Sequence, residues 1–545
     1  MEKQQRRQKV HAALNGNANT DASEDSQLMP ENPESVPMTK RPAGSGPEDA
    51  PDKKEPLYRM LLQNITVEPM LFPYLIASIL VILANQNLNI QKACRVELKL
   101  GSEVCDALEN KDQNSTLLTD SEITVQKLVA DMLIWQTILQ SSVPAVFVMF
   151  LGSWSDRNRL RRPCMLLPVY GEIVRNVGLL LCVHFFDELS MNITGLWQSL
   201  PIAITGYWTV IYMAVFSYVG DHSTDQNKSL RVGLVNLTMA MSLPIGTGLS
   251  GILYRAIGFS GVYIISLILC CISIWMGYIF VHDTKQIKLD SGKKQKKSYW
   301  NRIKFFFSLN HLIDAFKVTF KKEKNNRRMK VIALTFLITG IMGPLQGDKG
   351  VAYLFTRVKF NWNEVQFSVF STTTMCINLV GTFLTIGIVV RKFGIDDALI
   401  GTVATTGKLL AQFVFAFATT TFVFYLGAFV NFLQGPAIIS MKSIINKIIP
   451  AEELGQVSAV TSIGENVIPI LCGPLYSYVY ESTLSYFPGA YFLVTAAITV
   501  PTIFIYLWLY MQHRKETKES YNKLPDTDLL KDSNGITSKY GAIKP

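Results

Sequence analysis

Several charged side chains in this sequence lie inside long apolar runs, where a charge is costly unless it is paired or faces water. Glu172 and Arg175 are three residues apart, a spacing that lets them meet on one helix face. They are therefore either a structural ion pair or part of a proton-transfer site. Acidic residues in such positions are candidates for proton coupling, and we select Glu172, Asp348 and Glu465.

Basic residues in the same runs are candidates for binding an anionic solute, and we select Lys349 and Lys442. Asp348 and Lys349 stand together near the expected end of a run, so the alternative for both is a place at the membrane interface. Lys408 lies deep in another run, where it either snorkels to the interface or pairs with an acid.

Amide and aromatic side chains complete a candidate solute site. Asn85, Gln86 and Asn89 follow the i, i+1, i+4 spacing of one helix face, and lipid-facing amides are expensive. A second group consists of aromatic residues in another run, and its alternative role is packing or interface anchoring: Tyr207, Trp208 and Tyr212.

The apolar runs themselves define the fold class. The chain has 545 residues, of which 49% are hydrophobic and 17% charged, whereas soluble domains carry about 25% charged residues. A membrane-spanning helix needs about 20 mostly apolar residues. The runs predict an all-α membrane protein with twelve transmembrane helices in two six-helix bundles. We place the spans near 70–90, 125–151, 163–186, 199–220, 232–253, 261–281, 330–348, 365–390, 397–417, 421–446, 457–480 and 487–511.

A charged stretch in the middle of the chain divides the spans six and six. Its segment 299–320 mixes aromatic and basic residues, as in a helix that either lies in the membrane interface or packs on the inner face. The sequence thus predicts five parts: a disordered N-terminal tail at 1–66, a first bundle at 67–281, a basic linker at 282–329, a second bundle at 330–511 and a C-terminal tail at 512–545.

Lysine and arginine set the expected orientation. They concentrate in 152–163 and 282–329, whereas 187–198 contains neither. Because cytosolic loops carry the excess of positive charge, the basic loops and both termini are predicted to be cytosolic.

The loops 91–123 and 187–198 are then expected on the opposite side. Two glycosylation sequons fall in them, at Asn114 and Asn192. Cys94 and Cys105 share the first of these loops, which faces an oxidising compartment, so we expect a disulfide between them.

One local motif lies between the second and third spans, in the stretch 152–163. Gly152 permits a tight turn, and Asp156 can pair with arginines or cap a neighbouring helix. The stretch resembles the loop motif of the major facilitator superfamily, which implies a cytosolic gate made by Gly152, Asp156, Arg161 and Arg162. The alternative is a positively charged anchor without a gating role.

The resemblance extends to solute carrier family 46, which includes the proton-coupled folate transporter. It rests on the order and spacing of short matches between about 67 and 511: Val67-Glu68-Pro69, Phe216-Ser217-Tyr218-Val219-Gly220-Asp221, Lys442-Ser443, Glu453-Leu454-Gly455-Gln456-Val457, Glu465, Pro469 and Pro488-Gly489. The resemblance implies a transporter that alternates between two open states. It adds Asp221 to the proton-coupling candidates.

This chain also departs from the family pattern. Asn236 stands where the family commonly has a carboxylate, so it becomes a solute-binding candidate that cannot carry a proton. The predicted seventh span has no histidine, although the folate transporter has one there. The resemblance therefore implies the fold more strongly than it implies folate specificity or proton coupling.

We accordingly expect a secondary transporter of a small organic, anionic solute, folate-like or other, with no cofactor, no metal and no nucleic-acid partner. The alternative is a membrane receptor or scaffold that keeps a transporter fold. An enzyme is not expected, because the sequence lacks a P-loop, a G-x-S-x-G motif and a metal-ligand cluster.

The C-terminal tail contains two patterns that resemble sorting signals for endosomes and lysosomes. They are carried by Asp526, Leu529 and Leu530 and by Tyr540 and Ile543, so sorting adaptors are expected partners. The protein is predicted in the plasma membrane or in an endosomal or lysosomal membrane.

Overall fold

The computed structural model describes residues 65–110, 116–158, 160–223, 227–283, 327–385, 392, 395–448 and 451–522. Every regular element among them is helical. Residues 1–64 of the predicted N-terminal tail, the interface segment 299–320, Asn114 and the tail sorting residues lie outside the described residues. The described residues belong to one compact unit.

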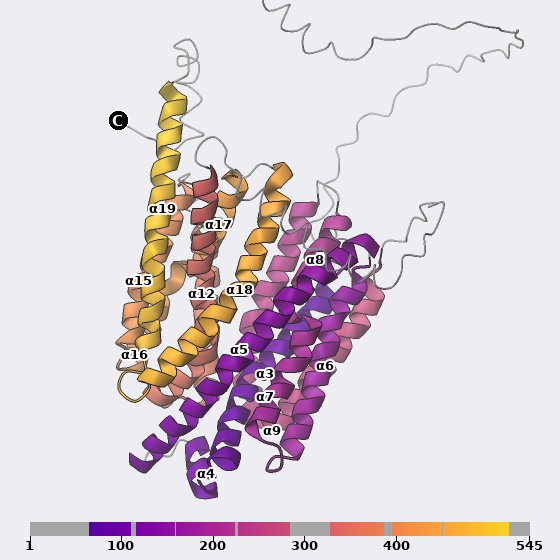
Figure 1. The fold of residues 1–545 in the computed structure, drawn as a ribbon, viewed down its shortest axis with the longest axis vertical. Helices are drawn as coiled ribbons and strands as arrows, with labels where there is room; N and C mark the ends of the chain where they lie inside the picture. Colours follow the sequence, from indigo (N-terminus) through magenta and orange to yellow (C-terminus); the bar gives the residue numbers. More distant parts are fainter. Residues whose placement is uncertain are drawn as a thin grey trace, which may run out of the picture. The chain divides into compact units, whose positions relative to one another are not determined.

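The described helices form two groups that follow the sequence (Figure 1). The N-terminal half comprises α3 (Glu68–Lys92), a π-helical turn (Ala93–Glu97), α4 (Ser102–Asn110), α5 (Thr116–Asn158), α6 (Arg162–His184), α7 (Met191–Thr205), α8 (Tyr207–Asp221) and α9 (Lys228–Phe280). The C-terminal half comprises α12 (Arg327–Phe360), α13 (Glu364–Leu384), α15 (Asp397–Ala416), α16 (Thr421–Val430), a 3-10 turn (Asn431–Leu433), α17 (Gln434–Ile448), α18 (Ala451–Thr483) and α19 (Ala490–Asn522).

Ten helices of the described part are long and apolar enough to cross a membrane. One of the ten, Leu230–Phe280, contains two helices that meet at Gly258, where the backbone is not helical. The 33-residue α18 is a further long helix, with two prolines inside it. The all-helical membrane fold is confirmed, and these elements are compatible with the twelve predicted spans.

The fourth span begins earlier than the sequence suggested. Helix α7 starts at Met191 because the Ser190 side chain accepts a hydrogen bond from the backbone N–H of Ile193 at 3.3 Å and so caps the first turn. The helix then breaks at Gly206, whose φ of 85° suits glycine, and α8 continues the span. Asn192, predicted in a loop, is an exposed residue of the first turn of α7.

The seventh span was predicted to end near Asp348, and this was wrong. Helix α12 continues to Phe360, so Asp348 and Lys349 lie well inside it and not at its end. The extension is held by a buried face that includes Val351, Leu354 and Phe355. Prolonged apolar burial therefore overrode the glycines, proline and charges that made the sequence look like a helix end.

The predicted loop 91–123 is also largely helical. It contains the π-helical turn, α4 and the first turns of α5. Cys94 and Cys105 form a disulfide that fixes α4 to the end of α3. The end of the molecule near α4 is called the α4 end below.

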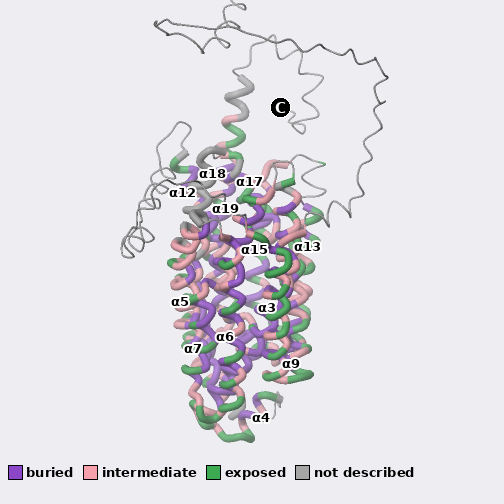
Figure 2. The backbone as a smooth tube through the Cα atoms, turned by 90° about the vertical axis from the view of Figure 1, so that its right-hand side faces the viewer, coloured by how far each residue is buried: buried purple, intermediate pink, exposed green. Residues whose placement is uncertain are grey.

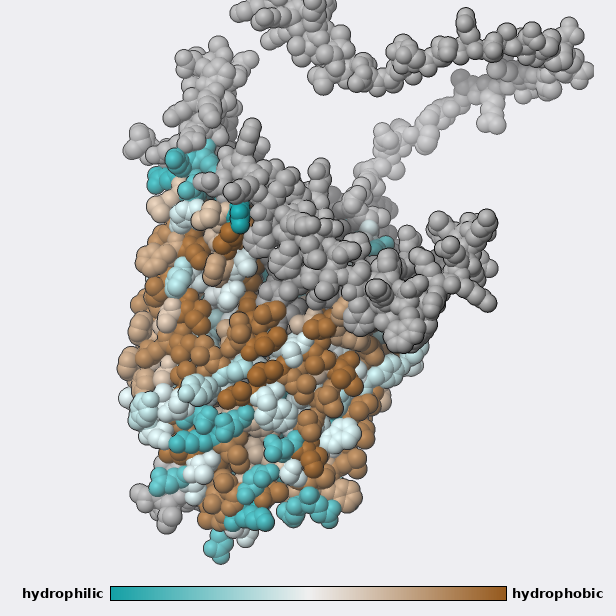
Figure 3. Space-filling model, viewed as in Figure 1, coloured by the Kyte–Doolittle hydropathy of each residue, from teal (hydrophilic) through white to brown (hydrophobic). Residues whose placement is uncertain are grey.

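Burial follows the expectations for helices in lipid. Buried and exposed positions alternate along the outer helices (Figure 2), whereas α3 is almost entirely buried. Large apolar side chains remain outside, such as Phe383 at 72% and Phe504 at 65% exposed. Apolar residues cover the middle of the face in Figure 3, and hydrophilic residues gather toward the α4 end. An apolar belt of this kind matches the hydrocarbon layer of a bilayer.

The two halves meet where α5 packs against α18 and where α9 packs against α13. In the second contact, a Cβ placed on Gly251 of α9 would lie 2.4 Å from the carbonyl oxygen of Glu364. Glycine at this position therefore permits the close approach of two helices from different halves. The hydroxyl of Ser368 accepts a hydrogen bond from the Gly251 N–H at 3.0 Å across the same contact.

We expect Gly251→Val to destabilise this packing by about 1–3 kcal/mol, because the added side chain overlaps backbone atoms. Thermal unfolding of the purified protein in detergent would report the loss. Gly233→Ala is the matched control on the same helix, since a Cβ there meets nothing within 4 Å. Equal melting temperatures for the two variants would contradict this account of the α9–α13 contact.

Candidate functional site

Lys349 is an exposed side chain in the interior of helix α12. Its Nζ donates a hydrogen bond to Gln346 Oε1 at 3.0 Å and stands 5.8 Å from the centroid of the Trp208 ring on α8. This separation is within the range of a cation–π interaction. Lys349 therefore faces the opposite half of the protein and not its own core.

Aromatic rings surround this contact on α8. The rings of Tyr207 and Trp208 are stacked with centroids 5.3 Å apart, and the Tyr212 ring lies 6.2 Å from Trp208. The Trp208 Nε1–H is buried without a hydrogen-bond partner among the described residues. The three aromatics that the sequence singled out thus form one group, of which Trp208 faces the Lys349 ammonium.

The amides of α3 share the predicted helical spacing, but they do not converge on one site. Asn85 accepts a hydrogen bond from Tyr263 at 2.9 Å, and Gln86 donates one to the Gly350 carbonyl at 3.2 Å. Asn89 exchanges two hydrogen bonds with Gln198. The polar groups are satisfied by three different helices, and only Gln86 reaches the C-terminal half.

Glu172 and Arg175 form a buried ion pair within α6. The i, i+3 spacing predicted this contact. Glu172 Oε2 and Arg175 Nε are buried without hydrogen-bond partners among the described residues, so the pair keeps unused polar capacity. Both residues belong to α6, so the ion pair itself lies within one helix.

Asp348 and Lys408 lie inside the C-terminal half. Asp348 accepts a hydrogen bond from Thr495 Oγ1 at 3.4 Å. Lys408, on α15, is 5% exposed, which excludes the predicted alternative in which it snorkels to the interface.

The predicted gate lies at the junction of α5 and α6, opposite the α4 end, and its geometry differs from the expectation. Gly152 is inside α5 and makes no turn, because the helix runs on to Asn158. Arg161 pairs with Asp221 at 2.8 Å and contacts Ser155 Oγ at 3.0 Å. Asp221 was a proton-coupling candidate and is here the partner of a gate arginine.

A different carboxylate fills the capping role expected of Asp156. Asp283 Oδ1 accepts hydrogen bonds from the backbone N–H groups of Arg161 and Arg162 at 2.7 and 2.9 Å. A carboxylate at the start of α6 is favourable there because the helix dipole is positive at that end. Arg162 stacks 4.6 Å over the Tyr278 ring, and the side chain of Asp156 lies outside the described part.

The remaining candidates are not brought together. Asn236 is exposed on α9, Lys442 is exposed on α17 and Glu465 is half-buried on α18. Their roles stay predictions.

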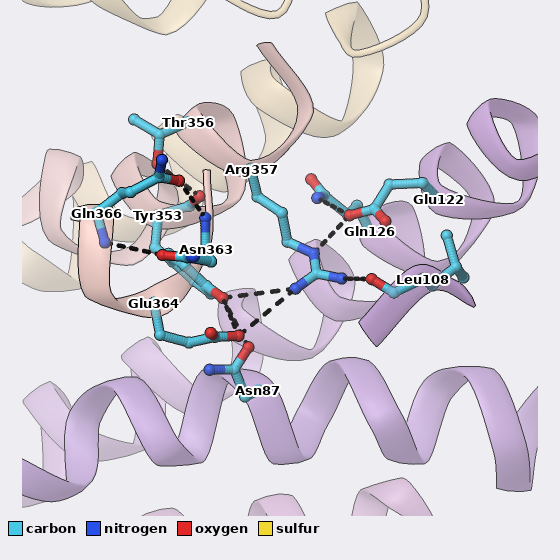
Figure 4. A network of polar contacts seen from close by, with 10 residues as sticks. All are labelled: Asn87, Leu108, Glu122, Gln126, Tyr353, Thr356, Arg357, Asn363, Glu364 and Gln366. Carbon is cyan, nitrogen blue, oxygen red and sulfur yellow. Dashed lines mark hydrogen bonds and ion pairs between the residues drawn. The ribbon is translucent and has the colours of Figure 1, made fainter. Parts of the chain in front are cut away.

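A cluster around Arg357, which the sequence analysis missed, joins the two halves at the α4 end (Figure 4). Arg357 is 3% exposed. Its Nε donates to Glu122 Oε1 at 2.6 Å, and Nη2 donates to the Leu108 carbonyl at 2.6 Å. On its other side, Nη1 is 4.0 Å from Glu364 Oε1.

Tyr353 extends this Arg357 cluster toward α3. Its hydroxyl lies 2.7 Å from Asn87 Oδ1 and 3.2 Å from Glu364 Oε1, and its single hydrogen can be donated to one of them at a time. On the far side, Gln126 donates to Glu122 at 2.9 Å and accepts from Tyr480 at 2.7 Å. The cluster therefore links α3, α4 and α5 to α12, α13 and α18.

Helix α4 is held in place for this contact by covalent and ionic bonds. The Cys94–Cys105 disulfide anchors it, and Arg95 pairs with Asp106 and, at 3.7 Å, with Glu109. The carbonyl of Leu108 can reach Arg357 because these bonds fix the short helix. Glu97 also accepts a hydrogen bond from the Met191 N–H at 3.1 Å, which ties the same corner to α7.

One sequence signal could have pointed to Arg357. It follows the Asp348–Lys349 pair on the continuing helix, in a stretch whose apolar residues Val351, Leu354 and Phe355 recur at helical spacing. Its partners Glu122 and Leu108 are more than 200 residues away, so no local spacing reveals them.

The pattern of the Major Facilitator Superfamily matches residues 74–471 and 350–533 of this chain. The chain therefore belongs to the major facilitator superfamily. Its fold and the proteins it is similar to identify it as a membrane transporter of small solutes.

Curated proteins similar to this chain include members of solute carrier family 46, the family that the sequence motifs resemble. The lysosomal proton-coupled steroid conjugate and bile acid symporter SLC46A3 of Gallus gallus is 22% identical over 458 residues, which cover 82% of this chain and 94% of that protein. The probable peptidoglycan muropeptide transporter SLC46 of Drosophila melanogaster is 20% identical, over 75% of this chain and 78% of its own. The proton-coupled folate transporter of Rattus norvegicus is 20% identical over 65% of this chain and 73% of that protein.

Solved structures share the fold. The human organic anion transporter MFSD10 superposes with a TM-score of 0.53 at 14% identity, over 83% of this chain and all of that one. A POT family transporter in complex with a thioalcohol-conjugated peptide gives a TM-score of 0.52 at 12% identity. The match covers 84% of this chain and 99% of that one.

The Arg357 cluster predicts an order of effects for its two acids. Glu122→Gln removes the close charged partner of a buried guanidinium, and breaking such a pair costs about 3–5 kcal/mol. Glu364→Gln, at 4.0 Å, should cost less. We expect faster amide hydrogen exchange in residues 102–110 and 351–360 for Glu122→Gln; an equal or larger effect of Glu364→Gln would contradict the assignment.

The disulfide is expected to act through the same contact. Replacing Cys94 and Cys105 by serine should speed hydrogen exchange in residues 102–110, because α4 loses its covalent anchor. Exchange in α15 is the internal control, since that helix lies in the other half away from α4. Unchanged protection of 102–110 would show that the ionic contacts of Arg95 suffice.

Proposed function

We propose that this transporter carries an organic anion with an apolar or aromatic body. In this proposal Lys349 binds the negative group, and Trp208 and Tyr212 contact the body of the solute. The observation that carries the proposal is the exposed Lys349 ammonium facing the Trp208 ring from the opposite half.

Physical chemistry supports this pairing. An ammonium group binds a carboxylate or sulfate through charge-assisted hydrogen bonds, which are about twice as strong as neutral ones. Gln346 positions the Lys349 side chain through its hydrogen bond at 3.0 Å. The Trp208 N–H, buried without a partner among the described residues, supplies one more donor near the same place.

The names of the relatives support the same chemical class. Two of them are named for steroid conjugates and bile acids or for folate. A conjugated steroid or bile acid combines an apolar ring system with one acidic group, which suits a lysine beside aromatic rings. We propose this class of solute for the present chain.

We further propose that the solute moves by alternating access, with the two halves rocking about the site. Several hydrogen bonds connect the two halves. In the N-terminal half they involve residues 86–87, 108–126 and 244–251. In the C-terminal half they involve residues 350–375 and 480. Most of these stretches lie toward the α4 end, whereas Pro244 and Thr372 lie nearer the middle of α9 and α13. In this state the α4 end is closed, and under the predicted topology that end faces the lumen or the exterior.

Uptake measurements test the proposal. Cells would express the chain without residues 526–543, to bring it to the surface, and receive a labelled steroid sulfate or a labelled taurine-conjugated bile acid. We expect Lys349→Ala to reduce uptake by at least tenfold and Lys349→Arg to keep part of it.

Lys359→Ala is the matched control, because Lys359 is an exposed lysine on the same helix, and its uptake should stay within twofold of the wild type. A neutral steroid with the same rings should not be taken up. Wild-type protein at the surface that takes up neither anion would contradict the proposed solute class, and full activity of Lys349→Ala would contradict the role of Lys349.

A further inference from the structure

Arg357 has a carboxylate from each half of the protein beside it (Figure 4). Toward the N-terminal half, its Nε donates to Glu122 Oε1 at 2.6 Å. Toward its own half, its Nη1 stands 4.0 Å from Glu364 Oε1, whereas a charge-assisted hydrogen bond measures about 2.8 Å. Arg357 is therefore bonded to Glu122, and a second carboxylate stands just outside bonding distance.

Tyr353 repeats this arrangement one turn earlier on α12. Its hydroxyl hydrogen has two acceptors, Asn87 Oδ1 of the N-terminal half at 2.7 Å and Glu364 Oε1 of its own half at 3.2 Å. The shorter distance identifies Asn87 as its partner in this state. The same hydroxyl accepts a hydrogen bond from Arg357 Nη1 at 3.5 Å. Glu364 Oε1 is thus the alternative acceptor for both side chains.

The turn between α12 and α13 keeps Glu364 beside Arg357. Only residues 361–363 connect the two helices. Within this turn Trp362 is 3% exposed, and its backbone N–H donates to the Thr356 carbonyl at 3.3 Å. Because the turn is short and packed into the C-terminal half, Glu364 and Arg357 stay together when the two halves move apart.

The present partners of Arg357 do not stay with it. Opening of the α4 end carries Glu122, Asn87 and the carbonyl of Leu108 away with the N-terminal half. A buried guanidinium left without its carboxylate is strongly destabilising, so opening requires a replacement. Glu122 needs none, because Gln126 of its own helix donates to it at 2.9 Å and water reaches it as the halves part.

Glu364 also has a simpler role to be separated from this one. It is the first residue of α13, where a negative charge is favoured by the helix dipole. That role concerns α13 alone and does not depend on Arg357. An effect of Glu364 that disappears when Arg357 is removed distinguishes the two roles.

We propose that Glu364 is a positioning residue of the transport cycle, which receives Arg357 and the Tyr353 hydrogen when the α4 end opens. With that end closed, Glu122 and the Leu108 carbonyl hold the guanidinium. With that end open, Glu364 holds it. The exchange keeps a buried charge paired in both states and so reduces the free-energy cost of opening. This inference rests on the alternating access of the proposed function and specifies the contact that changes.

The distance between two spin labels tests the inference without any solute. Asp120→Cys on α5 and Ser485→Cys just beyond α18 would carry the labels, because both side chains are exposed and stand near the helix ends at the α4 end. The exposed Cys271 and Cys376 would be replaced by serine. The full chain in lipid nanodiscs then gives the ratio of the open to the closed population.

Glu122→Gln should raise this ratio by about fivefold or more, because Arg357 loses the carboxylate of the closed state. Adding Glu364→Gln should lower it again by about fivefold, because the carboxylate of the open state is then missing as well. Adding Glu364→Asp instead should keep most of the increase. Glu103→Gln is the matched control, an exposed acid of α4, and should leave the ratio unchanged.

Arg357→Gln decides between the two roles of Glu364. In that background, Glu364→Gln should have no further effect on the ratio. A shift as large as in the presence of Arg357 would overturn the inference, and so would equal ratios for Glu122→Gln and for Glu122→Gln/Glu364→Gln. An α4 end that stays closed in every variant would instead contradict the alternating access of the proposed function. The expected shifts in a protein that takes up neither anion would contradict the proposed solute class alone.

Discussion

The placement of the Arg357 guanidinium governs how the two halves meet. A buried guanidinium must be matched by negative charge and by acceptors for its donors, since the uncompensated group costs several kcal/mol. Its partners are Glu122 and the Leu108 carbonyl from one half and Glu364 from its own half. No single helix provides all of them, so the cost of one buried charge requires α4, α5, α12 and α13 to converge. The disulfide already fixes α4 to the end of α3, so less chain entropy is lost when these helices come together.

The Arg357 cluster is polar, but it stands beside an apolar core that itself crosses between the halves, from Leu83 and Val125 to Val351 and Tyr480. Separate apolar clusters fill the N-terminal half, around Met70 and Leu71 and around Val81 and Leu88. Separating the two sides of a packed apolar core is costly, because the exposed surfaces would have to be hydrated or covered by other groups. Hydrogen bonds and ion pairs can be exchanged for water at a smaller net cost. The contact between the halves therefore combines exchangeable polar bonds with apolar packing, and both would have to part for the halves to separate.

The sequence predicted those features that depend on local spacing or on composition. The fold class followed from the apolar runs, and the Glu172–Arg175 pair followed from i, i+3 spacing. The Arg357 cluster could not be predicted in this way, because Glu122 and Arg357 are 235 residues apart and only the packed fold brings them together. The turn predicted at Gly152 was wrong, because glycine permits a turn but does not require one, and α5 continues as a helix to Asn158. Asn85, Gln86 and Asn89 share a spacing, but their partners on three neighbouring helices determine their directions.

Helix α12 unites these observations, because its two parts have different neighbours. The first part, as far as Gly347, lies closely on α18 and α19. The second part, from Gly350 to Arg357, bonds to Gln86, Asn87, Leu108 and Glu122 of the other half. Asp348 and Lys349 stand where the two parts join.

A rise of 1.5 Å per residue places Lys349 about 12 Å from Arg357 along the axis. A rigid helix transmits a displacement over that distance without any chain of side-chain contacts. A displacement at the junction therefore acts at once on the core of one half and on the contact with the other.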